Sequence, residues 1–90
     1  MSAVTREERQ RRRELYAEFR ARGCIRCGEA EPGVIDAHHL DRTTKRFGVG
    51  SPPAWVTVAD MEAELAKCIP VCSNCHIKQQ MGLWHESDLT

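Results

Sequence analysis

The sequence has no long apolar run: nowhere does it approach the roughly 20 consecutive apolar residues that a membrane-spanning helix needs. Residues 1–13 also lack an apolar stretch, because they are polar and rich in arginine, so no secretory leader is expected. These two absences predict a soluble cytoplasmic protein with no membrane partner, in a compartment where thiols stay reduced.

Net charge is lacking too, because 13 Lys and Arg balance 13 Asp and Glu to a formal charge of +0 at pH 7. Taken alone, this balance argues against a nucleic-acid partner. The distribution argues the other way: residues 1–26 carry a local charge of +4, and residues 27–90 carry −4. A basic arm can contact phosphates, whereas Arg–Glu pairs on a solvated helix explain the pattern equally well.

Cysteine is plentiful for a chain of 90 residues. A chain this short buries a modest core, so it needs a further stabilising device. Two CxxC pairs, Cys24 with Cys27 and Cys72 with Cys75, supply the four thiolates of a closed tetrahedral Zn²⁺ site. We therefore expect structural zinc, with free or disulfide-bonded thiols as the alternative. The fifth cysteine, Cys68, is expected to be buried as a small hydrophobic residue.

The chain begins with a predicted helix. Thr5 and Glu8 are spaced as in a capping box, and Gly23 is well placed to end the helix. Its apolar residues lie only in the second half, so we expect the first turns to project from the body. The arginines of those turns would then be free to lie along a phosphate backbone.

The rest of the chain is predicted to alternate strands and helices. The expected elements are a strand, a packing helix, a second strand and a final helix, at residues 34–40, 57–67, 68–72 and from about 73. The final helix is expected to carry Ile77, Met81 and Trp84 on its inner face. Residues 86–90 read as a tail. Residues 41–56 form an irregular loop in which Phe47 and Trp55 are interpreted as core anchors.

The histidines are the residues best suited to chemistry. Strand alternation places Asp36 and His38 on one face and His39 on the other, so the adjacent histidines have different roles. His76 directly follows a predicted zinc ligand. Phosphodiester hydrolysis needs a base that works near neutral pH, which imidazole provides, and a cation beside the phosphoryl oxygens. The alternative for these histidines is a buried or supporting role.

These residues are where the sequence resembles the HNH endonuclease family, whose members carry a ββα-metal (His-Me finger) motif. The resemblance is carried by residues 24–27 (Cys-Ile-Arg-Cys), 36–39 (Asp-Ala-His-His) and 72–76 (Cys-Ser-Asn-Cys-His). It implies an α+β fold, in which a small zinc-bound ββα-metal domain at residues 24–90 follows a basic N-terminal helix at residues 1–23. The family's central Asn has no counterpart at residues 67–69.

The resemblance also implies roles for the histidines. His38 and His76 become ligands of one catalytic divalent cation, which could be Mg²⁺, Mn²⁺, Ni²⁺ or Zn²⁺, with Asp36 as a supplementary ligand. His39 becomes the general base that activates water. The implied activity is a phosphodiester hydrolase that nicks or cleaves DNA.

DNA is therefore the expected partner, held by basic side chains. The residues expected to contact it are Arg9, Arg12, Arg13, Arg20, Arg42, Lys45 and Arg46. Family members of this size imply a phage or prophage setting, with the packaging terminase or another packaging protein as a partner in the bacterial host or phage-infected cell. The rival hypothesis is a non-catalytic zinc-ribbon module that binds DNA or protein through the arginine-rich helix. A redox CxxC protein is weaker, because no βαβ pattern surrounds either pair.

Overall fold

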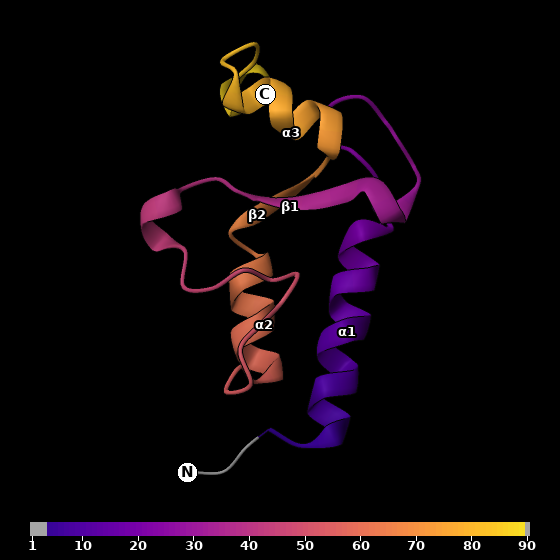
Figure 1. Cartoon of the computed structure of the whole chain (residues 1–90), viewed down its shortest axis with the longest axis vertical. Coiled ribbons are helices and arrows are strands. Elements are labelled where there is room, and N and C mark those ends of the chain that lie inside the picture. The colour runs from indigo at the N-terminus through magenta and orange to yellow at the C-terminus, as the bar shows by residue number, and fades with distance from the viewer. Residues whose placement is uncertain (1–3, 90) are drawn as a thin grey trace.

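The protein is an α+β structure with a small sheet. Two helices lie on one side of the sheet and a third helix lies on the other side (Figure 1). This computed structural model describes residues 4–89. Its helices and strands are α1 (Arg6–Arg20), β1 (Ile35–His39), α2 (Val58–Leu65), β2 (Cys68–Cys72) and α3 (Ser73–Gln80). Three short 3-10 turns complete it: η1 (Pro32–Val34), η2 (Arg42–Thr44) and η3 (Glu86–Leu89). Among the described helices, none has the length and apolar character needed to cross a membrane.

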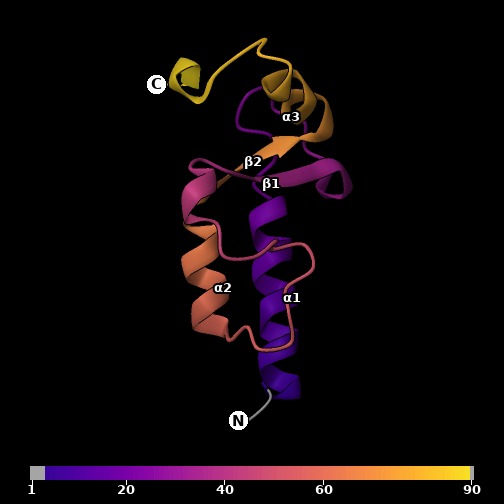
Figure 2. The same ribbon diagram turned by 60° about the vertical axis from the view of Figure 1, so that its left-hand side comes forward.

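The first helix begins and ends at the expected signals but does not project. The Thr5 side chain accepts a hydrogen bond from the Glu8 amide, and Gly23 follows the helix with a φ of 77°. The two views in Figures 1 and 2 show α1 beside α2 along much of its length. The buried Arg12 donates to the carbonyl oxygens of Pro53 and Val56 at 3.2 and 2.7 Å. The expectation of free first turns is therefore wrong, because polar contacts fasten them to the loop before α2.

The sheet is an antiparallel pair whose register positions the later site. Ile35 lies opposite Cys72, and His39 lies opposite Cys68. Between the strands, the chain forms η2, a loop and α2, which starts with a full capping box of Thr57 and Asp60. After β2, α3 begins at the next residue, without a linker.

The core has two parts. The first surrounds the cysteines and contains Ile35, Val71 and Trp84. The second lies between α1, α2 and the long loop, and contains Phe47, Val49, Val56 and Met61. The anchor interpretation holds for Phe47, which is buried. Trp55 instead leaves 44% of its surface exposed and packs edge to face on Phe47, with ring centroids 5.6 Å apart.

The C-terminal part differs from the sequence expectation. On α3, Ile77 and Met81 are 54% and 67% exposed, so they do not form an inner face. The helix ends at Gln80, and Gly82 adopts a φ of 79°, which turns the chain back so that only Trp84 reaches the core. Residues 86–89 are not a tail, because η3 lies against the body and Leu89 packs on the first core.

Candidate metal centre and histidine pocket

Four cysteines from two separate parts of the chain meet at one point. Cys24 and Cys27 come from the turn after α1, Cys72 ends β2, and Cys75 lies in the first turn of α3. Their sulfur atoms all lie within 4.8 Å of one another. This group therefore joins the start of the domain to the junction between β2 and α3.

The geometry fits a tetrahedral thiolate site. Zn–S bonds of about 2.3 Å place sulfurs about 3.8 Å apart, and the Cys27 and Cys72 Sγ atoms are 3.6 Å apart. Backbone amides point at the sulfurs: the Cys27 amide donates to Cys24 Sγ and the Cys75 amide to Cys72 Sγ, each at 3.4 Å. The four side chains could therefore hold a metal ion such as zinc, which would leave no open position for a substrate.

The fifth cysteine takes no part in this group. Cys68 is buried, and its Sγ donates to the Glu64 carbonyl oxygen at 3.5 Å. Burial raises the pKa of this thiol to about 11, so it stays protonated and packs as a small hydrophobic residue. The sequence expectation for Cys68 is confirmed.

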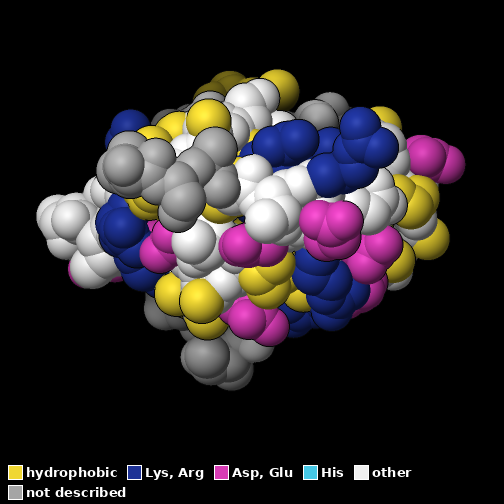
Figure 3. Space-filling view, turned by 90° about the horizontal axis from the view of Figure 1, so that it is seen from below, with side chains coloured by type: hydrophobic (Ala, Val, Ile, Leu, Met, Phe, Trp, Pro, Cys, Tyr) yellow, Lys and Arg dark blue, Asp and Glu magenta, His cyan; other side chains and the backbone are white. Residues whose placement is uncertain are grey.

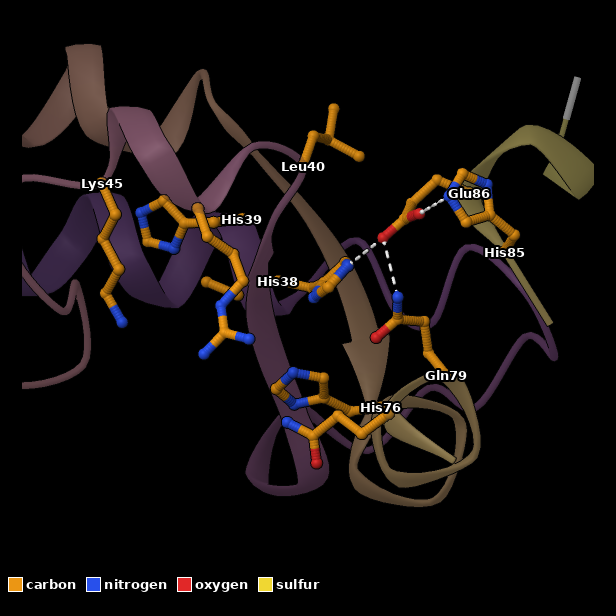
Figure 4. A pocket seen from close by; sticks show the side chains of 11 residues that line it. His38, His39, Leu40, Lys45, His76, Gln79, His85 and Glu86 are labelled. Atoms are coloured by element: carbon orange, nitrogen blue, oxygen red, sulfur yellow. Dashed lines mark hydrogen bonds and ion pairs between the residues drawn. The ribbon is translucent and has the colours of Figure 1, made fainter. Parts of the chain in front are cut away.

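The three candidate histidines line one pocket of about 520 Å³, together with Arg42, Lys45 and Glu86. His38 and His39 come from β1 and His76 comes from the first turn of α3 (Figure 4). The His38 and His76 rings meet edge to face, with centroids 5.1 Å apart. His39 lies on the other side of β1 from His38, as strand alternation predicts.

Carboxylates hold the two histidines that face each other. His38 Nε2 is hydrogen-bonded to Glu86 Oε1, and His76 Nδ1 lies 3.1 Å from Asp36 Oδ2. The bond with His38 lowers the pKa of Glu86, so this carboxylate is ionised at neutral pH. Each of the two rings therefore has one nitrogen engaged and one nitrogen left over.

His39 has a more deeply buried partner. Its Nε2 lies 2.9 Å from Glu64 Oε2, and the Glu64 side chain is 0% exposed. Burial alone would raise the pKa of Glu64. Hydrogen bonds from the Arg46 amide, from Lys67 and from His39 outweigh burial and lower this pKa to about 2. Glu64 therefore remains a carboxylate at neutral pH and fixes the orientation of the His39 ring.

The possible ligand atoms at the histidine pocket lie less close together than the four cysteine sulfurs do. Within residues 4–89, the four cysteines are the one group of three or more ligand residues whose donor atoms lie within 4.8 Å. The pocket still offers two imidazoles side by side, with the carboxylates of Asp36 and Glu86 next to them. Imidazole nitrogen is a good ligand for ions such as Zn²⁺ and Ni²⁺, and carboxylate oxygen is a good ligand for Mg²⁺ and Mn²⁺.

The basic residues divide into those at the pocket and those elsewhere. Arg42 and Lys45 are exposed and line the histidine pocket, whereas none of the residues that line this pocket comes from α1. Within α1, Arg12 is buried, Arg9 donates to the Val4 carbonyl oxygen at 3.0 Å, and Arg13 donates to Gln10 at 2.8 Å.

Two more predicted DNA contacts also have partners within the chain. Arg20 donates to the Ile35 carbonyl oxygen at 3.2 Å, and Arg46 pairs with Asp60 at 3.3 Å. Seen from the end opposite α3, basic and acidic side chains alternate and no histidine is visible (Figure 3). This face is therefore mixed in charge rather than uniformly basic.

Sequence reasoning named Asp36 but missed the other two carboxylates that hold the histidines, Glu64 and Glu86. Glu64 shares the buried face of α2 with Met61, three residues earlier, and an acid on an apolar face was the available signal. No local pattern pointed to Glu86, because its place depends on the chain reversal at Gly82. His85 is exposed, as expected, and its Nε2 lies 3.3 Å from Glu86.

Comparisons with protein families, with curated proteins and with solved structures found no match for this chain. The α+β fold and the cysteine group therefore rest on the geometry described above. What the histidine pocket does has to be argued from its chemistry.

Proposed function

We propose that this chain is a metal-dependent endonuclease of the HNH type, which cuts DNA phosphodiester bonds with His39 as the general base. The supporting observation is that His38, His39 and His76 line the same pocket although α3 lies far along the chain from β1. Arg42 and Lys45 on the rim supply positive charge for a phosphate. These are the groups that phosphodiester hydrolysis requires.

The contacts of His39 favour it as the base. Its Nε2 is held by Glu64, and Nδ1 has no hydrogen-bond partner among the described residues. A carboxylate on one ring nitrogen keeps the proton there and leaves the other nitrogen free to accept a proton from water. The ionised Glu64 then stabilises the imidazolium that forms, because the two groups meet in a buried setting.

The remaining pocket residues suit substrate and cation binding. His38 and His76 would hold the divalent cation, which, when bound, supplies positive charge at the phosphoryl and leaving oxygens. Arg42 and Lys45 would hold the phosphodiester against the pocket, with guanidinium and ammonium groups donating to its oxygens. The acidic partners of the histidines repel a phosphate, so these two cations offset a local negative charge.

The cysteine group has a structural part in this proposal. Cys75 immediately precedes His76, so an ion held by the four thiolates would fix the first turn of α3 beside β1. The family resemblance further suggests a phage or prophage setting, with a packaging terminase as partner in the cytoplasm of the host cell.

A non-catalytic binding module is the second candidate, and one observation favours it. Ile77, Met81 and Leu83 are 54%, 67% and 62% exposed, and exposed apolar side chains close together are typical of protein-binding surfaces. In this alternative the four cysteines only stabilise the fold, and the histidines have supporting roles.

Plasmid cleavage separates the two candidates. We expect the zinc-loaded protein to nick supercoiled DNA when Mg²⁺, Mn²⁺ or Ni²⁺ is added. His39→Ala should lower the cleavage rate by about 100-fold or more, because it removes the general base. DNA affinity and zinc content should survive in this variant.

Lys78→Ala is the matched control. It removes an exposed side chain of α3 that does not line the pocket and should leave cleavage unchanged. Absence of nicking by the wild type with every divalent ion, at normal DNA affinity, would reject the nuclease and support the module.

A further inference from the structure

Each of the three pocket histidines has one ring nitrogen on a carboxylate. The pairs are His38 Nε2 with Glu86, His39 Nε2 with Glu64 at 2.9 Å, and His76 Nδ1 with Asp36 at 3.1 Å. A neutral imidazole carries one proton, and a carboxylate can only accept. The carboxylate therefore places the proton on the nitrogen that it contacts and leaves the lone pair on the opposite nitrogen.

We infer that Glu86 is a positioning residue for the proposed cation site, because its carboxylate holds the Nε2–H form of His38 and leaves Nδ1 to bind the ion. Asp36 holds the Nδ1–H form of His76 in the same way and leaves Nε2 of His76 to bind the ion. This inference rests on the proposed function and refines it, since the carboxylates orient the ligands from outside. Histidines that bind metals in proteins commonly donate their second N–H to such a partner.

The arrangement of the two rings agrees with this assignment. In Figure 4, the nitrogen of His38 that is turned away from Glu86 lies on the side of the ring facing His76. The ring centroids are 5.1 Å apart. Metal–nitrogen bonds of about 2.1 Å place two donor nitrogens on one ion roughly 3 to 4 Å apart, which facing edges of such rings can reach.

Glu86 is held in place by several contacts from different elements. Its Oε1 also accepts from Gln79 Nε2 of α3 at 3.2 Å, and His85 Nε2 lies 3.3 Å from its Oε2. The segment around it is anchored on both sides. Trp84 is buried and donates to the Cys75 carbonyl oxygen at 2.7 Å, and Leu89 packs on the same core. The packing of Trp84 and Leu89 thus places the Glu86 carboxylate of η3 against His38.

The test compares three variants of the zinc-loaded protein by calorimetric titration with Mn²⁺. Glu86→Ala should weaken Mn²⁺ binding by about 10- to 100-fold, the usual loss when the outer partner of a ligand is removed. Glu86→Gln should keep most of the affinity, because its amide oxygen still accepts from His38 Nε2–H. Asp88→Asn is the control: it removes a charge from the same turn, where Asp88 accepts from the His85 amide instead.

A second measurement shows directly which ring nitrogen of His38 carries the proton. Long-range proton–nitrogen NMR spectra, recorded at mildly alkaline pH before Mn²⁺ is added, should show the Nε2–H form of His38 in the wild type and in Glu86→Gln. Glu86→Ala should lose this preference while its zinc content and circular dichroism stay unchanged.

The outcomes separate the inference from the proposed function. Equal losses of affinity in Glu86→Gln and Glu86→Ala would make Glu86 a direct ligand and overturn the inference. Unchanged affinity in Glu86→Ala, or an Nδ1–H form of His38 in the wild type, would overturn it as well. A wild-type protein that binds Mn²⁺ nowhere outside the cysteine group would reject the proposed cation site itself.

Discussion

Glu64 is the residue on which the histidine pocket depends most. It is 0% exposed and joins three parts of the chain, because its carboxylate accepts from His39 in β1, the Arg46 amide in the loop and Lys67 after α2. Glu64 thereby ties the loop at Arg46 to β1 and to the end of α2.

The first prediction at this scale concerns Glu64→Gln. Gln removes the ionised acceptor shared by His39, the Arg46 amide and Lys67. We therefore expect the free energy of unfolding to fall by about 3 kcal/mol at neutral pH, since each pKa unit of differential stabilisation is about 1.4 kcal/mol. The pKa of Glu64 is lowered from 4.5 to about 2 in the folded protein. A lowered pKa stabilises the fold above the unfolded-state pKa, and this contribution is lost as the pH falls from about 4.5 toward 2.

Urea unfolding followed by circular dichroism at several pH values measures this effect. The difference between wild type and Glu64→Gln should be largest at neutral pH and shrink in acid. Glu62→Gln, an exposed change on the same helix, should behave like the wild type. A wild-type advantage that stays constant down to low pH would show that Glu64 does not titrate as described.

For the helices and strands, features set by neighbouring residues could be predicted from the sequence more easily than contacts between distant segments. The caps at Thr5 and Thr57 and the strand alternation of residues 35–39 were predictable, because each is decided by neighbours a few residues away. The two CxxC pairs predicted the meeting of distant segments, because four thiolates can share one ion.

The expectations that failed all concern tertiary contacts. Arg12 reads as a surface charge, yet its guanidinium is enclosed by carbonyl oxygens of the loop before α2. Ile77 and Met81 have the spacing of a buried face, but Gly82 reverses the chain so that Trp84, unlike these two, packs in the core beside Cys75. The spacing of apolar residues in one helix does not show whether another part of the chain packs against that face.

The second prediction concerns the junction between β2 and α3. Trp84 is 6% exposed and donates to the Cys75 carbonyl oxygen, so its fluorescence reports on this junction. If the four cysteines hold a metal ion, a strong chelator should remove it and shift the emission to longer wavelength, because metal binding and folding are coupled in such sites.

Two variants make that measurement specific. Trp55→Phe removes the exposed tryptophan of the loop and should leave the shift intact. Cys68→Ala should still bind one zinc ion, whereas Cys72→Ser should bind zinc poorly and emit at long wavelength without a chelator. Full retention of zinc by Cys72→Ser would contradict the assignment of the four ligands.

For the whole molecule, the distribution of charge decides how DNA would approach. The chain has no net charge, and on α1 several basic side chains pair with acids or with backbone oxygens. At the histidine pocket, Arg42 and Lys45 are exposed beside the residues proposed to act on a phosphodiester. Of the DNA contacts expected from the sequence, the proposed function therefore relies on Arg42 and Lys45 at the pocket rather than on the arginines of α1.

The last prediction follows from this difference and uses the salt dependence of DNA binding. Each phosphate contact changes the slope of log affinity against log salt by about 0.9 on duplex DNA. The double variant Arg42→Ala with Lys45→Ala should therefore reduce the magnitude of the slope by about 2. Arg13→Ala, a change at another exposed residue, on α1 away from the pocket, should leave the slope almost unchanged. If Arg13→Ala flattens the slope and the double variant does not, DNA lies along α1, and the phosphate contacts proposed at the histidine pocket are wrong.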